Sequence, residues 1–245
     1  MPDHRLLERD RQWQRKPALR MVYVDLYRRI AAAMVAGRVL EVGAGTSGFK
    51  EFTSGVIASD VLFAPWLDVL AGAERLPFRD NSFGNIVMFD VLHHLSSPAA
   101  FFAEASRLLT PGGRVVMIEP AITPVSWPFY RFLHDEPVQL RADPLAVAPI
   151  DSPRDPFDAN QAIPTLLFVR QPERFAARFP ALSLVRVEWL SLLAYPLTGG
   201  FRPWSLIPVR LVEPLLRLEG KLLPAVGRLM AFRLLAVVER RPARA

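Results

Sequence analysis

The sequence predicts an α/β fold built around a mainly parallel sheet. Between residues 18 and 120, apolar segments of strand length alternate with amphipathic helical segments. This alternation is typical of βαβ units with right-handed crossovers. Three of the five predicted strands end in an acidic residue, namely Asp60, Asp90 and Glu119. Ligands of such sheets bind beyond the carboxyl ends of the strands, so we expect the functional site at these acids.

The predicted elements follow one another in a regular order. A short polar helix is expected over residues 5–16, and an amphipathic helix over 18–36 has apolar side chains every three or four residues. A glycine loop, 43–48, follows the first strand. A helix over 98–109 and a tight turn at 111–113 lead into the fifth strand. The five strands are expected at Val39–Val42, Val56–Asp60, Trp66–Leu70, Asn85–Asp90 and Arg114–Glu119.

The amino-acid composition changes after Glu119. Residues 120–164 are rich in proline and aromatic side chains, and long excursions at the ligand end of a sheet often form lids. A helix is expected over 172–179, and segments 182–193 and 232–239 are expected to close the sheet as an antiparallel pair. Between them, 203–230 is leucine-rich and predicted to be helical, with breaks at its prolines, which are Pro208, Pro214 and Pro224.

Length and composition indicate one domain with a sizeable core. The chain has 245 residues, of which 51% are apolar and 22% charged. We divide this single domain, 1–245, into N-terminal helices (1–36), a binding core (37–120), a cap (120–164) and a C-terminal part that closes the sheet (165–245), with the helical insertion 203–230. The absence of cysteine excludes a disulfide scaffold, a thiolate metal site and a cysteine nucleophile.

The charge is concentrated toward the two ends of the sequence. Residues 1–20 carry a net charge of +3, residues 202–245 carry +6, and the middle carries −3. The basic residues of 202–245 are spaced among leucines, which favours an amphipathic surface over a nucleic-acid-binding tail. Peripheral contact with an anionic membrane and an ordinary solvated helix face both remain open. The longest uncharged run, Trp189–Phe201, is too short for a transmembrane helix, so we expect a cytoplasmic protein, at most peripheral to the inner face of the membrane.

The glycine loop fits two kinds of cofactor. Gly43, Gly45 and Gly48 match the spacing of the dinucleotide fingerprint. A dinucleotide, however, brings a pyrophosphate that needs donors and no nearby carboxylate, and Glu41 stands two residues before the loop. S-adenosylmethionine instead carries a sulfonium and an ammonium, which carboxylates attract. Asp60 follows Gly45 by 15 residues and is placed for ribose hydroxyls. The sequence therefore favours S-adenosylmethionine over NAD.

A longer set of motifs resembles a known family. In order these are the segments 39–45 (VLEVGAG), Asp60, 73–78 (AERLPF), 81–83 (NSF), 90–95 (DVLHHL) and 104–113 (EASRLLTPGG). Together they resemble the class I S-adenosylmethionine-dependent methyltransferases, in particular the small-molecule branch. The resemblance covers about residues 37–120. It implies a Rossmann-like sheet of seven strands, mostly parallel, with helices on both faces, the last strand antiparallel and cap insertions.

The resemblance also implies roles for individual residues. Glu41 is expected to face the methionine end of S-adenosylmethionine, Asp60 the ribose, the backbone of Ala73 the adenine, and Asp90 and His94 the methionine moiety. The full set of expected cofactor-binding residues is Glu41, Gly43, Ala44, Gly45, Asp60, Val61, Ala73, Glu74, Asp90 and His94. Three positions depart from the family pattern: Ser47 replaces the third loop glycine, Gly72 replaces an acid, and Gly84 replaces an aspartate, the last for a structural reason.

The predicted function is methyl transfer to a small acceptor. The aromatic cap and the leucine-rich 203–230 segment favour a lipid-like or quinone-like acceptor. Such a displacement depends mainly on positioning, and a base is needed only if the nucleophile must lose a proton. Base candidates at the strand ends and in the cap include Glu119 and Tyr130, and those expected to be catalytic are His94, His134 and Glu136. We expect no metal site, because His93 and His94 are adjacent and no third ligand is spaced to join them.

Three other functions remain as alternatives. A non-catalytic cofactor-binding or assembly protein would keep the same fold, and an NAD-dependent oxidoreductase would use the same glycine spacing. A nucleic-acid methyltransferase is disfavoured, because the middle of the chain is net acidic and no base-binding pocket motif is present.

Overall fold

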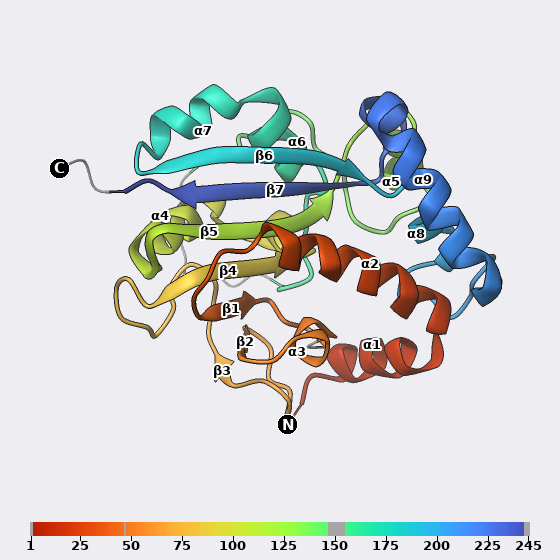
Figure 1. Cartoon of the computed structure of the whole chain (residues 1–245), viewed down its shortest axis with the longest axis horizontal. Coiled ribbons are helices and arrows are strands. Elements are labelled where there is room, and N and C mark those ends of the chain that lie inside the picture. The colour runs from red at the N-terminus through yellow and green to blue at the C-terminus, as the bar shows by residue number, and fades with distance from the viewer. Residues whose placement is uncertain (1, 47, 147–154, 243–245) are drawn as a thin grey trace.

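The computed structural model describes residues 2–46, 48–146 and 155–242, and shows a seven-stranded sheet between two layers of helices (Figure 1). The strand order is β3-β2-β1-β4-β5-β7-β6. Only β7 runs antiparallel to its neighbours within this sheet, so the predicted architecture is confirmed. The strands are β1 (Val39–Val42), β2 (Val56–Asp60), β3 (Val69–Leu70), β4 (Phe83–Phe89), β5 (Leu109–Pro120), β6 (Leu182–Leu190) and β7 (Arg233–Arg240).

The helices form a layer on each face of the sheet, and α5 (Ser126–Phe132) belongs to the cap. One layer contains α1 (His4–Arg15), α2 (Pro17–Ala33), α3 (Gly48–Phe52), α8 (Ala194–Thr198) and α9 (Val209–Met230). The other contains η1 (Leu92–His94), α4 (Pro98–Leu108), α6 (Ile163–Thr165), η2 (Leu166–Arg170) and α7 (Pro172–Arg178).

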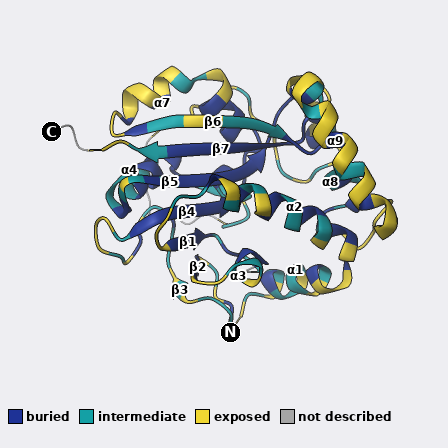
Figure 2. Ribbon diagram, viewed as in Figure 1, coloured by how far each residue is buried: buried dark blue, intermediate teal, exposed yellow. Residues whose placement is uncertain are grey.

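The core forms because alternate strand residues face opposite layers. In β4, Ile86 and Met88 pack with the α4 and α7 side, whereas Val87 packs with α2 and α9. The central strands are therefore buried on both faces, as Figure 2 shows for β4, β5 and β7. This double burial explains why these strands read as continuous apolar runs in the sequence.

Several predicted boundaries were wrong. The third strand covers only Val69–Leu70, not Trp66–Leu70, and the strand expected over 182–193 ends at Leu190. Strand β5 starts at Leu109, before the predicted turn, because Leu109 already pairs with Phe83 across a register shift. Helix α9 starts at Val209, not at residue 203, and continues through Pro214 and Pro224 without a break. Both prolines are exposed. The carbonyl groups that they leave without an N–H partner can therefore be hydrated, so the helix tolerates them.

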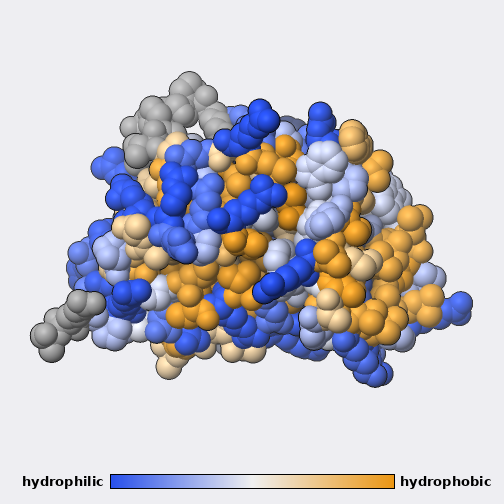
Figure 3. Space-filling model, turned by 90° about the horizontal axis from the view of Figure 1, so that it is seen from above, coloured by the Kyte–Doolittle hydropathy of each residue, from blue (hydrophilic) through white to orange (hydrophobic). Residues whose placement is uncertain are grey.

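A buried carboxylate fixes α9 to the rest of the molecule. Glu219, only 3% exposed, accepts hydrogen bonds from the backbone N–H groups of Leu192, Leu193 and Ala194. The outer side of α9 carries exposed leucines, and Figure 3 shows apolar side chains gathered at the end of the molecule that holds this helix. None of the helices in the described ranges is long and apolar enough to cross a membrane.

Candidate functional site

A cavity of about 1260 Å³ lies at the carboxyl ends of β1, β2, β4 and β5. Every residue that the sequence predicted for cofactor binding lines it, and so do the predicted catalytic residues His94, His134 and Glu136. The topology brings them together because parallel strands present their carboxyl ends at the same edge of the sheet. Ser47, one of the three departures from the family pattern, lies outside the described residues.

The glycine loop shapes one wall of this cavity. Gly43 has a φ of +67°, and a side chain on it would collide with Val91, so only glycine suits this position. The carboxylate of Asp60 fixes the loop from the next strand, because its Oδ2 accepts a hydrogen bond from the Gly45 N–H at 2.9 Å. Its Oδ1 accepts one from the Leu62 N–H at 2.9 Å. The loop backbone is thus held against β2, with its open side toward the cavity.

Glu41 is the buried carboxyl group next to this loop. Its side chain lines the cavity, the residue is 4% exposed, and Oε2 has no hydrogen-bond partner in the structure. Burial, together with the nearby charge of Asp60, raises the pKa of Glu41 to about 8. A buried carboxylate with an unpartnered oxygen is costly, and a cationic ligand group removes that cost. The residues here therefore fit the ammonium and sulfonium of S-adenosylmethionine.

The two remaining departures, Gly84 and Gly72, differ in their surroundings. A side chain on Gly84 would lie 2.7 Å from the carbonyl oxygen of Ala36, because the loop before β1 crosses β4 closely there. Its structural role, expected from the sequence, is confirmed. Gly72 is open, since an added Cβ would meet only Glu74 Oε2 at 3.6 Å. Glu74 also lines the cavity, and its Oε1 accepts a hydrogen bond from the Ser96 hydroxyl at 3.2 Å.

A polar cluster occupies the side of the cavity formed by η1 and the cap. Glu119, fully buried at the end of β5, accepts hydrogen bonds from the backbone N–H groups of Val91 and Leu92 at 2.9 and 2.8 Å. Its other oxygen lies 2.7 Å from His93 Nδ1. On the far side of the ring, His93 Nε2 is 3.4 Å from Glu136 Oε2. Burial opposes the charged form of His93, but the two carboxylates outweigh it and raise its pKa to about 10.

Glu136 joins both histidines, which corrects the expectation that no third ligand meets them. It comes from the cap, 42 residues beyond His94, and its Oε1 lies 3.9 Å from His94 Nε2. Burial opposes ionisation of Glu136, but its contact with His93 lowers its pKa to about 2. Burial and the charge of His93 lower the pKa of His94 to about 4. His134 also contacts Glu136, since its Nδ1 accepts a hydrogen bond from the Glu136 backbone N–H at 3.3 Å.

A buried arginine that the sequence did not predict also lines this cavity. Arg233 begins β7, is 2% exposed, and forms two ion-pair contacts with Asp90, one of them 2.7 Å from Nη2 to Oδ2. Its guanidinium lies 3.9 Å from the centre of the Tyr195 ring. The available signal was an arginine in the otherwise apolar segment 232–238. Asp90 therefore lines the cavity as half of an ion pair.

The roof of the cavity was also not predicted. It combines α1, through Leu6 and Arg9, with the segment 199–204 that follows α8. Lys16 connects the two parts, because its buried Nζ donates to the carbonyl groups of Thr198, Gly200, Arg202 and Trp204 at 2.5–2.9 Å. The first helix, expected only to be polar, thus covers part of the site.

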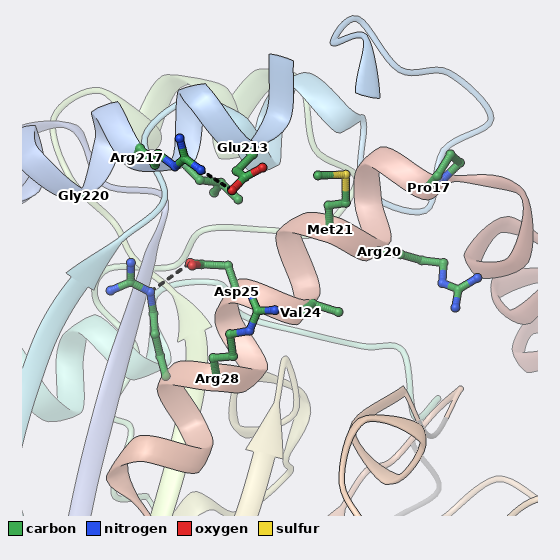
Figure 4. Close-up of a pocket in the computed structure, with 11 residues that line it drawn as sticks. Pro17, Arg20, Met21, Val24, Asp25, Arg28, Glu213, Arg217 and Gly220 are labelled. Carbon is green, nitrogen blue, oxygen red and sulfur yellow. Dashed lines mark hydrogen bonds and ion pairs between the residues drawn. The ribbon is translucent and has the colours of Figure 1, made fainter. Parts of the chain in front are cut away.

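A second hollow, of about 750 Å³, lies between α2 and α9 (Figure 4). Its polar walls are occupied by ion pairs within each helix, Arg29 with Asp25 and Arg217 with Glu213. None of the predicted site residues lines it. The larger cavity is therefore the candidate active site.

Comparisons with known proteins agree with this fold. Residues 40–117 match the family model described as a methyltransferase domain. The chain is 27% identical over 212 residues to a demethylmenaquinone methyltransferase from Streptomyces avermitilis, covering 79% of this chain and 81% of the relative. It is 32% identical over 130 residues to a protein of the same name from Beutenbergia cavernae, covering 47% and 53%.

Solved methyltransferases share the fold at low sequence identity. A SAM-dependent methyltransferase from Archaeoglobus fulgidus superimposes with a TM-score of 0.53 at 14% identity, covering 91% of this chain and 94% of that one. A putative methyltransferase from Bacillus halodurans gives a TM-score of 0.50 at 17% identity, covering 89% and 99%. Residues 40–117 thus match a methyltransferase domain, and the chain shares its fold with a solved SAM-dependent methyltransferase.

Proposed function

We propose that this protein transfers the methyl group of S-adenosylmethionine to a small, quinone-like aromatic acceptor. The observation that carries the proposal is one continuous cavity with two different ends. The end at β1 and β2 holds Glu41 and Asp60, and the end at the cap is lined by aromatic side chains, which are Phe129, Tyr130, Tyr195 and Phe201. A cationic cofactor suits the first end, and a flat apolar ring suits the second.

The cofactor roles follow from the positions in the cavity. Glu41 pairs with the charged methionine end, and the backbone of Gly43, Ala44 and Gly45 follows the length of the cofactor. Asp60 and Val61 hold the ribose. Ala73 and Glu74 hold the adenine, while Asp90 and His94 flank the reacting sulfur. These assignments are supported by the lining of the cavity and by the unpartnered Oε2 of Glu41.

The acceptor roles fall to His94, His134 and Glu136. With pKa values of about 4 and about 2, His94 is neutral and Glu136 ionised at neutral pH. Both are therefore weak bases but good hydrogen-bond acceptors. Their contribution is to orient an acceptor hydroxyl, so that the nucleophilic atom lies in line with the methyl–sulfur bond, while the roof excludes water.

The surroundings of the cavity mouth support an acceptor with an apolar portion. Leu133, Trp204 and Leu206 line the cavity and remain 62%, 40% and 70% exposed. Arg131, Arg202 and Arg210 are exposed in the same segments. The relatives described above are named for demethylmenaquinone. We propose that this rim also gives peripheral contact with an anionic membrane.

Calorimetric titration with S-adenosylhomocysteine tests the cofactor assignment. The wild type is expected to bind S-adenosylhomocysteine, and Asp60→Ala to bind it at least tenfold more weakly. The substitution removes the carboxylate that both holds the glycine loop and is proposed to bind the ribose. Asp80→Ala is the matched control, since Asp80 is 67% exposed and lies outside the cavity. Binding of NADH but not of S-adenosylhomocysteine would overturn the proposal in favour of an oxidoreductase.

Two further assays test the acceptor and the membrane contact. Labelled S-adenosylmethionine with a reduced demethylnaphthoquinone is expected to give a methylated ring, and no transfer by protein that binds the cofactor would favour a non-catalytic role. Sedimentation with anionic vesicles is expected to retain the wild type and to release Leu133→Ser/Leu206→Ser. Equal sedimentation of the two proteins would exclude the rim as the contact.

A further inference from the structure

We propose that His93, His94 and Glu136 form a binding site for one divalent transition-metal ion at the acceptor end of the cavity. The site would take an ion that prefers two imidazole nitrogens and a carboxylate, of which Zn²⁺, Fe²⁺ and Co²⁺ are examples. Its use in methyl transfer rests on the proposed function, but the binding itself does not.

The geometry of the three side chains carries the inference. One ligand atom from each residue lies within 4.8 Å of the other two. The closer pairs are His93 Nε2 with Glu136 Oε2 at 3.4 Å and His94 Nε2 with Glu136 Oε1 at 3.9 Å. Tetrahedral zinc with bonds of roughly 2.1 Å separates its ligand atoms by about 3.4 Å. The three groups thus need only small rotations to meet one ion.

Each proposed ligand is also oriented by a second group. His93 Nδ1 faces Glu119 at 2.7 Å, and His94 Nδ1 faces the carbonyl oxygen of Asp158 at 3.2 Å. Both rings therefore donate from Nδ1 and turn Nε2 inward, toward Glu136. Gln161 Nε2 donates a hydrogen bond to Glu136. Ligating histidines typically donate their other N–H to a carboxylate or a carbonyl group, and that partner sets the ring orientation.

The site leaves room for a further ligand. All three residues line the cavity, in which they form part of one wall, so at least one coordination position is directed to the open space. An acceptor oxygen bound there would ionise more readily, because the ion stabilises the oxyanion. This would supply the activation that the weakly basic His94 and Glu136 do not provide.

A buried ion pair is the competing interpretation. The proton on His93 Nε2 and a metal ion use the same lone pair, so a cluster that only holds its proton would bind no metal. The experiment must therefore measure binding directly, with folding checked for every variant.

Cobalt titration of metal-free protein without a polyhistidine tag tests the site. The visible absorption of Co²⁺ is expected to saturate at one equivalent for the wild type, and zinc is expected to displace the cobalt. Glu136→Gln and His94→Gln are each expected to weaken binding at least tenfold. His4→Gln is the matched control, because His4 is exposed on α1 and lies outside the cavity.

Two results would overturn the inference: no saturable cobalt binding by folded wild type, or binding that Glu136→Gln and His94→Gln leave unchanged. S-adenosylhomocysteine binding and thermal unfolding are measured on the same samples. A failure of metal binding with intact cofactor binding rejects the metal site and leaves the proposed function standing. Loss of both with an altered unfolding curve identifies a variant that does not fold, and His94→Asn then replaces His94→Gln.

Discussion

Asp90 and Arg233 are 143 residues apart in the sequence and form a two-contact ion pair at the end of the sheet. Asp90 follows β4 with a φ of +57°, and Arg233 opens β7. Since β5 lies between these two strands, the pair spans the width of three strands. It therefore joins the parallel half of the sheet to the antiparallel strand that closes it, at the wall of the candidate site.

Removing one partner of this pair is expected to destabilise the fold more than removing both. Asp90→Asn leaves the fully buried guanidinium without its counter-charge, which costs about 3 kcal/mol in the free energy of unfolding. Adding Arg233→Met removes the orphaned charge and should restore part of that loss. Urea unfolding of the two single variants and the double variant measures the coupling. Costs that simply add would show that the pair contributes no specific interaction.

Glu41 is expected to make stability depend on pH. Burial raises its pKa from 4.5 to about 8, so the folded state holds the proton more tightly than the unfolded chain. Its contribution is complete below pH 4.5 and is lost as the pH rises through 8. At about 1.4 kcal/mol for each pKa unit, the loss amounts to about 3–5 kcal/mol. Denaturant unfolding at pH 5 and pH 8.5 should show the wild type losing this much relative to Glu41→Gln. An equal pH dependence of the two proteins would contradict a buried, neutral Glu41.

The four carbonyl groups that surround the Lys16 ammonium, here called the carbonyl cage, are expected to hold the roof of the cavity closed. Lys16→Met removes a donor to four carbonyl groups, which should lower the free energy of unfolding by about 3 kcal/mol. Hydrogen exchange should become faster in residues 198–206 before it changes elsewhere. Lys221→Met, an exposed change on α9, controls for loss of a lysine. Unchanged exchange in 198–206 would mean that the roof is held by its apolar contacts alone.

The same Gly→Ala substitution is expected to have opposite effects at Gly43 and at Gly220. Gly43→Ala forces a side chain against Val91 at a positive φ, so cofactor binding should fall at least tenfold. A Cβ on Gly220, inside α9, meets nothing within 4 Å, so Gly220→Ala should stabilise the fold by about 0.5–1 kcal/mol. Calorimetry and thermal unfolding of both variants measure the two effects. A cofactor affinity of Gly43→Ala equal to that of wild type would show that the loop backbone does not approach the ligand.

The parts of the fold that local patterns determine were predictable from the sequence. An apolar run such as 85–90 must be buried on both faces, and acids at strand ends converge because parallel strands share one edge. The lining of the cavity by Glu41 and Asp60 follows from the second of these facts. The glycine spacing alone fitted two kinds of cofactor, and the carboxylates of Glu41 and Asp60 favoured the one that carries cationic groups.

Contacts between distant segments were not predictable in the same way. Nothing near Glu136 in the sequence indicates its contact with His93, and nothing near Lys16 indicates its carbonyl partners. Such pairs depend on how the crossovers and the cap place whole segments. The breaks predicted at Pro214 and Pro224 were wrong because a local pattern was given too much weight. The effect of these prolines on the helix is outweighed by packing through Val212 and Glu219.

The carbonyl cage of Lys16 has a consequence for how the protein is made. Its four acceptors are synthesised 182 to 188 residues after the lysine itself. During translation α1 and α2 leave the ribosome before residues 198–204, so the ammonium group of Lys16 stays in water until these acceptors have emerged. Because contacts so distant in the sequence form slowly, the mouth of the cavity is expected to close in one of the last steps of folding. A nascent chain is expected to bind no cofactor before that step.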